Sequence, residues 1–357
     1  MLRWWTPSAR NSSITVSPIR SCVRTGTGLD FGTLCFMSTR LIIWARPEQE
    51  TLLRDAIREA ELELLAVGSD TPDGTGALSQ MFQVERLGDL RQVIRRTDVD
   101  LLWLASPAPI EEAERRLIRE MDLLTISSEP RPGDIATLAI HPDDVAPEVF
   151  MPLMRRSESF QSALQILETH SPPQGILLSF RSRPGEGTLF ARLFDAMDLI
   201  DQLCGEVESV SATLAESGLS VTTARPPIPE TLMNLRGHMS LNVHFGDNRC
   251  ASALLSNCTD SWYRSVTMLT DDGSLHLTDS GCGWSGDDGE IHEYAPTPVS
   301  AGVLVGRQIK RLRENLKHPD PPPNYPRLLA LCEAARLSCR TGQSESPSRM
   351  LAMLSHV

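Results

Sequence analysis

Three aspartates lie close together in one predicted helix, and their carboxylates are the first candidates for chemistry in this sequence. Asp195, Asp198 and Asp201 follow one another at every third position of the helix predicted at 187–203. At ~100° per residue they spread over a broad arc of one helix face, where neighbouring carboxylates influence one another. Such a cluster shifts pKa values and suits general acid and base chemistry in a cleft. A hydrophilic helix face is the alternative, and the sequence leaves both interpretations open.

The turn after the first predicted strand lacks the glycines that a nucleotide-binding turn normally contains. The strand at 40–45 runs directly into Arg46-Pro47-Glu48-Gln49. Glycines in this turn let the backbone approach a pyrophosphate at the N-terminus of the following helix. Glu48 and Glu50 would instead repel a pyrophosphate at the same amides, because both carry negative charge. We therefore expect a dinucleotide to bind weakly or not at all.

Two charged residues, Arg46 and Asp70, follow the first two predicted strands and are still candidates for cofactor contacts. Arg46 could offer its guanidinium to a phosphate, or it could be a solvated loop residue. Asp70 stands where an acidic residue would bind a ribose hydroxyl, or it could be an ordinary surface turn residue. The surface interpretation is favoured for both residues, because the glycines are missing.

The predicted elements of residues 38–150 follow the order of a parallel sheet covered by helices. The expected strands are 40–45, 62–67, 99–105 and 123–127, and the expected helices are 48–61, 87–96 and 110–120. Strands that alternate with helices in this way are typical of a sheet covered on both faces. We predict an α/β domain with a Rossmann-like parallel sheet for this part of the chain.

The pattern changes after about residue 150. The expected helices are 150–169, 187–203, 301–316 and 327–339, and the expected strands are 207–215, 239–245, 250–256, 265–269 and 274–278. Gly246-Asp247-Asn248 and Asp271-Asp272-Gly273 are turn sequences between strands and indicate antiparallel pairing. Residues 281–289 are predicted to be a flexible loop. The second domain, 151–357, is therefore expected to be an α+β domain with an open, mainly antiparallel sheet.

Two segments carry a resemblance to a known family. Residues 97–107, with the sequence TDVDLLWLASP, are similar to the "dpdvDaviiatP" strand of the Gfo/Idh/MocA oxidoreductases. Residues 193–210 are similar to the helix of that family that ends in Ile-Asp, six residues and Gly, and to the strand that follows it. The resemblance covers about residues 39–345. It implies hydride transfer between a sugar or cyclitol carbon and NAD or NADP, with a lysine and a histidine handling the hydroxyl proton.

The resemblance also implies positions for the site residues. Ser106, Pro107 and Ser128 correspond to cofactor-binding positions, and the Glu-Lys-Pro run of the family corresponds to Ser128-Glu129-Pro130. Glu129 thus replaces the lysine, and neither of the two lysines of the chain lies before residue 310. Asp195 falls on the histidine position, whereas Asp198 falls on an aspartate that is retained. If the chain is an enzyme, Glu129, Asp195 and Asp198 are its candidate acid and base groups.

Three hypotheses for function follow. The first is a catalytically degenerate member of this fold that keeps the interdomain cleft to bind a small sugar-like molecule or to regulate. The second is an active NAD(P)-dependent oxidoreductase or lyase on a sugar or cyclitol that uses carboxylates as acid and base. The third is a structural subunit of a hetero-oligomer. The resemblance further implies a homo-oligomer formed through the C-terminal sheet.

Charge and cysteine content narrow the partners and the compartment. The formal net charge of −12 argues against a nucleic-acid or anionic-membrane surface, because both require a basic stripe. The eight cysteines include no Cys-x-x-Cys pair, so we expect reduced thiols in a cytoplasmic protein. The spacing of the cysteines and histidines between residues 238 and 282 matches none of the usual zinc ligand patterns.

The first 37 residues differ from the rest of the chain. Four arginines face a single acidic residue in a Ser- and Thr-rich segment without amphipathic period. Such a composition is typical of a transit peptide, but translation from Met37 is the favoured alternative. In either case we expect residues 1–37 to be disordered.

Overall fold

The computed structural model describes residues 38–94, 96–106, 117–118, 120–121, 123–140, 148–216, 229–286, 297–315 and 320–354. Two of the sequence-based predictions therefore lie wholly or mainly outside the described residues. They are the disorder expected for residues 1–37 and the helix expected at 110–120.

The first sheet, sheet A, contains six parallel strands in the order β3-β2-β1-β4-β5-β6. The strands are β1 (Thr39–Trp44), β2 (Leu62–Gly68), β3 (Glu85–Leu87), β4 (Leu101–Leu104), β5 (Leu124–Ser127) and β6 (Glu148–Phe150). Each neighbouring pair is parallel, and the order 3-2-1-4-5-6 is that of a Rossmann sheet. The prediction of a Rossmann-like parallel sheet is confirmed.

Helices and loops cover both faces of sheet A because its strands are apolar on both sides. Leu41 and Ile43 of β1 face a core shared with α1 (Glu50–Ala60) and α8 (Ala301–Glu314). Ile42 and Trp44 face a second core that includes residues of the 87–93 segment. Helices α2 (Pro72–Phe82) and α3 (Arg91–Ile94) also belong to this region, whereas α5 (Ile135–Ile140) packs against α9 (Tyr325–Thr341) and α10 (Pro347–Leu354) in the region of the second sheet.

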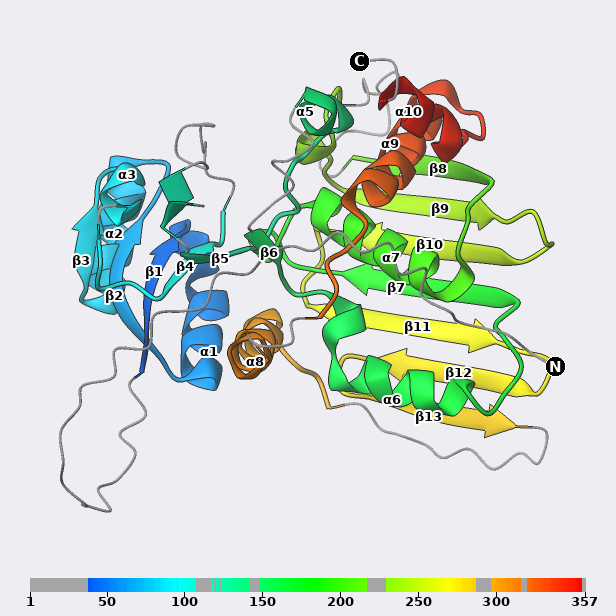
Figure 1. The fold of residues 1–357 in the computed structure, drawn as a ribbon, viewed down its shortest axis with the longest axis horizontal. Helices are drawn as coiled ribbons and strands as arrows, with labels where there is room; N and C mark the ends of the chain where they lie inside the picture. The colour runs from blue at the N-terminus through cyan, green and yellow to red at the C-terminus, as the bar shows by residue number, and fades with distance from the viewer. Residues whose placement is uncertain are drawn as a thin grey trace. The chain divides into compact units, whose positions relative to one another are not determined.

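Helix α8 comes from the second half of the sequence, yet it packs against α1 (Figure 1). Gly302 and Gly306 make this close approach possible, because a Cβ atom at Gly302 would lie 2.4 Å from the Leu52 carbonyl oxygen and one at Gly306 would lie 2.9 Å from that of Ala56. The last part of the chain thus helps to close the core of the first sheet.

The second sheet, sheet B, contains seven strands in the order β13-β12-β11-β7-β10-β9-β8. The strands are β7 (Gly175–Arg181), β8 (Ser209–Ala215), β9 (His238–His244), β10 (Cys250–Ser256), β11 (Tyr263–Leu269), β12 (Gly273–Thr278) and β13 (Gly281–Gly286). Only the β7–β10 pair is parallel. The mainly antiparallel sheet is therefore also confirmed.

One face of sheet B carries helices, as Figure 1 shows for α6, α7 and α9. The helices of this region are α6 (Glu158–Leu167), α7 (Leu189–Cys204), α9 (Tyr325–Thr341) and α10 (Pro347–Leu354), with short 3₁₀ turns η3 (Met154–Arg156) and η4 (Leu232–Asn234). Along β7 the inward residues Ile176, Leu178 and Phe180 belong to the core, whereas Leu177 on the other face is 57% exposed. This alternation is that of a sheet with one open face.

Helix α7 is the central helix of this layer, and most of its residues are buried. It begins at the N-cap Thr188, whose hydroxyl accepts a hydrogen bond from the Ala191 N–H, and it ends at Gly205, whose φ is +77°. Three charged side chains, Arg192, Asp195 and Asp198, are buried within it. Because buried charges are costly unless they are paired, these residues need partners from other elements.

Two predicted elements of the second domain were wrong in detail. Residues 281–286, predicted as loop, form β13, because Cys282 and Trp284 pack against the core while the strand pairs with β12. The helix predicted at 150–169 begins only at residue 158, where Ser157 caps α6 by accepting a hydrogen bond from the Phe160 N–H. Strands β3, β6 and β7 and helices α2, α5 and α10 were not predicted.

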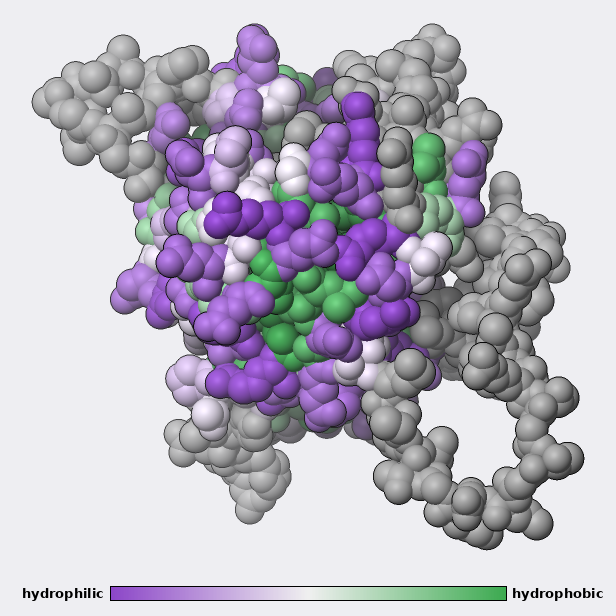
Figure 2. Space-filling model, turned by 90° about the vertical axis from the view of Figure 1, so that its left-hand side faces the viewer, coloured by the Kyte–Doolittle hydropathy of each residue, from purple (hydrophilic) through white to green (hydrophobic). Residues whose placement is uncertain are grey.

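The surface on the sheet A side is mainly hydrophilic, with a hydrophobic area at the centre of the face seen in Figure 2. Within the described ranges, no helix has the length and apolar character needed to cross a membrane.

Candidate functional site

The carboxyl ends of β4 and β5 bring three of the predicted site residues to one edge of sheet A. Ser106 and Ser128 are buried just beyond these strands, and the Ser128 hydroxyl accepts a hydrogen bond from the Trp103 indole at 3.0 Å. Glu129 follows Ser128 and is only 2% exposed. Pro107, the other predicted cofactor position here, lies outside the described residues.

Glu129 links this edge of sheet A to the start of α7. One of its carboxylate oxygens accepts a hydrogen bond from the Thr188 N–H at 2.9 Å, and the other accepts one from the Thr188 hydroxyl. Burial raises the pKa of Glu129, although the two hydrogen bonds from Thr188 oppose the rise. The carboxylate thus binds the N-cap residue of α7, where negative charge is favourable.

Arg46 and Asp70 lie beside each other at the ends of β1 and β2. Their side chains form an ion pair with a distance of 3.0 Å between guanidinium and carboxylate, and both are partly exposed. The residue predicted to bind phosphate and the residue predicted to bind ribose are therefore each other's partners.

The turn between β1 and α1 has few free amides. Residues 47–49 form the 3₁₀ turn η1, in which Pro47 has no N–H and the Gln49 N–H donates to the Arg46 carbonyl. The N–H of Glu50 donates to the Pro47 carbonyl. A helix start binds phosphate through its free N–H groups, and this turn uses most of them internally.

Gln49 fastens the same turn to two other parts of the chain. Its side-chain amide donates to the carbonyl oxygens of Ala105 at 2.8 Å and Gly185 at 2.9 Å, and its own oxygen accepts from the Arg46 N–H. Gly185 belongs to the segment between β7 and α7. This segment therefore lies against the β1–α1 turn, where a Rossmann domain normally holds a pyrophosphate.

Each of the three aspartates on α7 pairs with an arginine from a different element. Asp195 pairs with Arg264 of β11 at 2.6 Å, Asp198 with Arg155 of η3 at 3.1 Å, and Asp201 with Arg327 of α9. The cluster is thus not a solvated helix face. Its carboxylates connect α7 to three neighbouring elements.

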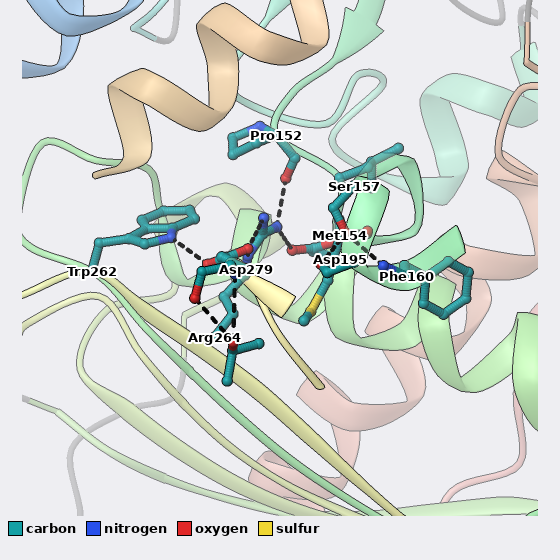
Figure 3. Close-up of polar contacts among 12 residues, drawn as sticks. Pro152, Met154, Ser157, Phe160, Asp195, Trp262, Arg264 and Asp279 are labelled. Carbon is teal, nitrogen blue, oxygen red and sulfur yellow. Dashed lines mark hydrogen bonds and ion pairs between the residues drawn. The ribbon is translucent and has the colours of Figure 1, made fainter. Parts of the chain in front are cut away.

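Arg264 is the centre of the largest of these networks (Figure 3). Its guanidinium donates to Asp195, to Asp279 and to the carbonyl of Pro152, and Asp279 also accepts from the indole of Trp262. Burial would lower the pKa of Arg264, but the Asp279 and Asp195 carboxylates outweigh it and raise the pKa overall. The second oxygen of Asp195 accepts from the Met154 N–H at 2.8 Å.

Asp198 lies in an environment that favours its neutral form. Burial raises its pKa to about 7, against the effect of Arg155 and with a smaller contribution from Asp195. A carboxyl group that titrates near neutral pH is able to exchange protons under physiological conditions.

Arg192 is the one buried guanidinium near this network whose nitrogens make no hydrogen bond to the described residues. Its side chain is 0% exposed and lies over the Trp262 ring at 4.3 Å from the ring centroid. Gly187 packs against it, because a Cβ atom there would lie 3.2 Å from an Arg192 nitrogen and the backbone φ is +123°. Burial lowers the pKa of Arg192 to about 10. We call Glu129, Thr188, Arg192, Asp195, Arg264 and Asp279 the α7 polar cluster.

The fold of the chain is similar to that of several solved oxidoreductases. An oxidoreductase from Agrobacterium radiobacter in complex with NAD⁺, L-tartaric acid and magnesium is 13% identical, with a TM-score of 0.65 over 88% of this chain and 100% of that chain. A levoglucosan dehydrogenase in complex with NADH and L-sorbose is 13% identical, with a TM-score of 0.66 over 87% and 99%. Apo scyllo-inositol dehydrogenase from Lactobacillus casei is 14% identical, with a TM-score of 0.63 over 87% and 98%.

The chain has the Gfo/Idh/MocA fold. No family model matches the sequence, and no curated protein is detectably similar to it. At these low identities the structural similarity establishes only the fold. The chemistry of this chain has to be argued from its own residues.

Several residues of the site were missed by the sequence analysis of this Gfo/Idh/MocA-fold chain. Arg264 lies on the inward face of β11, on the same side of the strand as the buried Val266 and Met268. A charged residue at such a position is a recognisable sign of a buried ion pair. Arg192 likewise interrupts an apolar stretch of α7. Gln49 gave no signal, because its partners are distant in the sequence.

The cysteines and histidines considered for zinc lie on the strands and turns of sheet B. Cys250 and His244 face each other across β10 and β9, and His276 lies on β12. Among the residues that the structure describes, no three His, Cys, Asp or Glu side chains are grouped to hold a metal ion.

Proposed function

We propose that this protein is a non-catalytic binding protein built on the Gfo/Idh/MocA fold, and that its ligand is a small anionic, sugar-like molecule. The observation that carries the proposal is the buried ion pair between Asp195 and Arg264 at 2.6 Å. In the resembling family the position of Asp195 belongs to a histidine that handles a proton, so the state of Asp195 bears directly on catalysis.

Asp195 is poorly placed to accept a proton from a substrate. Both of its oxygens already accept hydrogen bonds, one from Met154 and one from Arg264. A substrate hydroxyl would have to displace one of these buried contacts to reach a carboxylate oxygen. Its contacts support a structural role.

Glu129 supports the same conclusion. Its carboxylate binds Thr188 through both oxygens, and it occupies the position of a lysine that would donate to a substrate hydroxyl. Both oxygens already act as acceptors toward Thr188, so neither is free to donate to a substrate hydroxyl. The lysine chemistry of the family is therefore not reproduced by this residue.

The β1–α1 turn fits a nicotinamide dinucleotide poorly. Pro47 removes one amide, the Arg46–Asp70 ion pair occupies both predicted cofactor ligands, and Gln49 binds the 185 segment to the turn. A pyrophosphate would have to displace these contacts and face Glu48. We propose that binding of NAD(P) is weak or lost, although the fold neighbours include proteins in complex with NAD⁺ or NADH.

The anionic ligand class is supported by Arg192. Burying a guanidinium that makes no hydrogen bond costs about 1–3 kcal/mol or more in desolvation free energy. A carboxylate offers two acceptors in the geometry that a guanidinium matches best. Such a ligand would reach Arg192 when the segment around Gly187, which packs against it, gives way.

The second candidate is an active oxidoreductase that uses Asp198 as its base. It is favoured by one observation, the pKa of Asp198 of about 7, which suits proton transfer at neutral pH. Against it stands the ion pair of Asp198 with Arg155.

Cofactor binding and turnover separate these two functions. We expect titration calorimetry with NAD⁺ and NADP⁺ to give no micromolar affinity. We also expect no change at the reduced-nicotinamide absorbance band with glucose, gluconate or myo-inositol. The variants D195N, E129Q and D198N serve as comparisons. Turnover in the wild type that any of these substitutions abolishes would establish the carboxylate mechanism and overturn the non-catalytic proposal.

Ligand-dependent stabilisation tests the binding role. Gluconate and glucuronate should raise the melting temperature more than glucose or myo-inositol, and R192Q should remove the difference. R183Q is the matched control, since Arg183 lies in the same segment but is exposed. Equal effects of acids and neutral sugars would refute the anionic ligand class. The absence of stabilisation by every compound would favour a structural subunit.

We also propose that two copies associate through the open face of sheet B and that the protein is cytoplasmic. Leu177, Leu254 and Leu269 on that face are 57%, 51% and 53% exposed, which is unusual for leucine. The six cysteines within the described residues are all free thiols, which supports a reducing compartment.

A further inference from the structure

A cavity of about 210 Å³ lies outside the α7 polar cluster, between β6, α8 and the chain around Asp320. Its deepest residues are Met151 and Gln308, which are 1% and 5% exposed. Its outer part is formed by Asn315 and Pro322, which are exposed. The full lining is Val149, Met151, Arg156, Gln308, Arg311, Leu312, Asn315, Asp320 and Pro322.

Two of the polar side chains in this cavity are fixed by the protein itself. The amide of Gln308 donates to the Leu153 carbonyl at 2.6 Å and accepts from the Leu153 N–H at 3.1 Å. Arg311 donates to the carbonyl of Arg156 at 3.1 Å and to Asp320 at 3.3 Å. These contacts hold α8, η3 and the 320 segment in place around the cavity.

Arg156 differs from them because its guanidinium has unused donors. Its Nε and one Nη are buried and make no hydrogen bond to the described residues. Among the residues that the structure describes, no carboxylate forms an ion pair with it, although Asp320 and Asp198 are near enough to influence its charge. A guanidinium in this state favours an acceptor that can bind two of its N–H groups at once.

The charges around the cavity favour a single negative charge. Among the residues that line the cavity, Arg156 and Arg311 are positive and Asp320 is negative. Arg311 pairs with Asp320 at 3.3 Å, so the positive charge of Arg156 is in excess. Binding of a monoanion would neutralise this excess, whereas a neutral molecule would leave it. The excess is the electrostatic reason to expect an acid here.

The remaining lining is apolar and therefore favours a ligand with an apolar body. Val149, Met151, Leu312 and Pro322 offer no hydrogen-bonding side-chain atoms. An apolar cavity of about 150 Å³ is large enough to bind benzene, so the present volume accepts a six-membered ring with a carboxyl group. We propose that this cavity binds a small monocarboxylate with an apolar body, with the carboxylate on Arg156 and the apolar part against Met151 and Leu312.

The test uses phenylacetate and its neutral analogue phenylacetamide as probes, with the full-length protein and titration calorimetry or ligand-observed NMR. We expect phenylacetate to bind at least about tenfold more tightly than phenylacetamide, because a charge-assisted bidentate hydrogen bond is available only to the acid. R156Q should abolish this preference. R307Q should keep it, because Arg307 lies on the same helix but is exposed and pairs with Glu59.

A second variant keeps the test decisive if R156Q is unstable. L312F fills the cavity without changing its charge, and it should weaken binding of both probes in equal proportion. Equal affinity of the wild type for acid and amide would overturn the proposal, as would an unchanged preference in R156Q or unchanged binding in L312F. Competition by inorganic phosphate as strong as that by phenylacetate would refute the apolar part of the assignment. None of these outcomes depends on the proposed function at the α7 polar cluster.

Discussion

Asp195 of α7 and Arg264 of β11 form an ion pair of 2.6 Å in which neither side chain is exposed to solvent. The pair ties the central helix of the second domain to the sheet beneath it, and Asp279 and the Pro152 carbonyl complete the environment of the guanidinium. Asp195 is therefore part of the structural core of this protein.

Removing Asp195 should destabilise the protein strongly. We expect D195A to lower the free energy of unfolding by about 3–5 kcal/mol, because Arg264 would keep a buried charge with one partner fewer. Urea denaturation followed by circular dichroism measures this change. D247A removes an exposed partner of Arg249 and is the control, for which we expect a far smaller effect. A D195A protein as stable as the wild type would show that the ion pair is not structural.

Glu129 and Thr188 should be energetically coupled across the two sheets. We expect E129A and T188V each to destabilise the protein, and the double variant to lose less than the sum of the two, with a coupling energy of about 1–3 kcal/mol. The reason is that both substitutions remove the same pair of hydrogen bonds. A double-mutant cycle in urea measures the coupling. Strict additivity would contradict a direct contact.

The stability contributed by Asp198 should depend on pH. Burial raises its pKa in the folded state to about 7, whereas the unfolded value is near 3.9. The unfolded chain therefore loses this proton first as the pH rises. The stabilisation by the protonated folded form is fully present below about pH 4 and is lost as the pH rises through about 7.

The substitution D198N removes this titration. Between pH 5 and pH 7 the wild type should lose about 2–3 kcal/mol relative to D198N, at 1.36 kcal/mol per pH unit. Urea denaturation at a series of pH values measures the difference. E208Q, a change at an exposed residue of the 205–208 segment, is the comparison variant. Parallel curves for wild type and D198N would refute the raised pKa.

The open face of sheet B should mediate self-association. Leu254 lies on that face and is 51% exposed, so L254D places a charge where two copies would meet. Light scattering coupled to size-exclusion chromatography should give a dimer or larger oligomer for the wild type and a monomer for L254D. The control is L117D, at an exposed leucine outside sheet B. A monomeric wild type at micromolar concentration would contradict the interface.

The sequence by itself determined the two-sheet architecture. The apolar runs of β1 and β4 predict strands buried on both faces, and the alternation along β9 and β10 predicts a sheet with one open face. These signals are local, because they depend only on the spacing of apolar residues within a segment. The same spacing placed Asp195 and Asp198 on one arc of a helix. The spacing of apolar residues did not predict β13, because half of its residues are glycines and it has only two apolar side chains that pack on the core.

Only the tertiary structure decided what the site residues touch. Asp195 meets Arg264 at a separation of 69 residues, Glu129 meets Thr188 at 59, and Gln49 meets Gly185 at 136. Hydrogen bonds at such separations depend on how helices and sheets pack, and the periodicity of a single segment carries no information about them. For the same reason, only the packed side chains reveal that buried guanidinium nitrogens of Arg192 and Arg156 make no hydrogen bond to the described residues. Local spacing thus set the fold, whereas long-range packing set the chemistry that the fold can support.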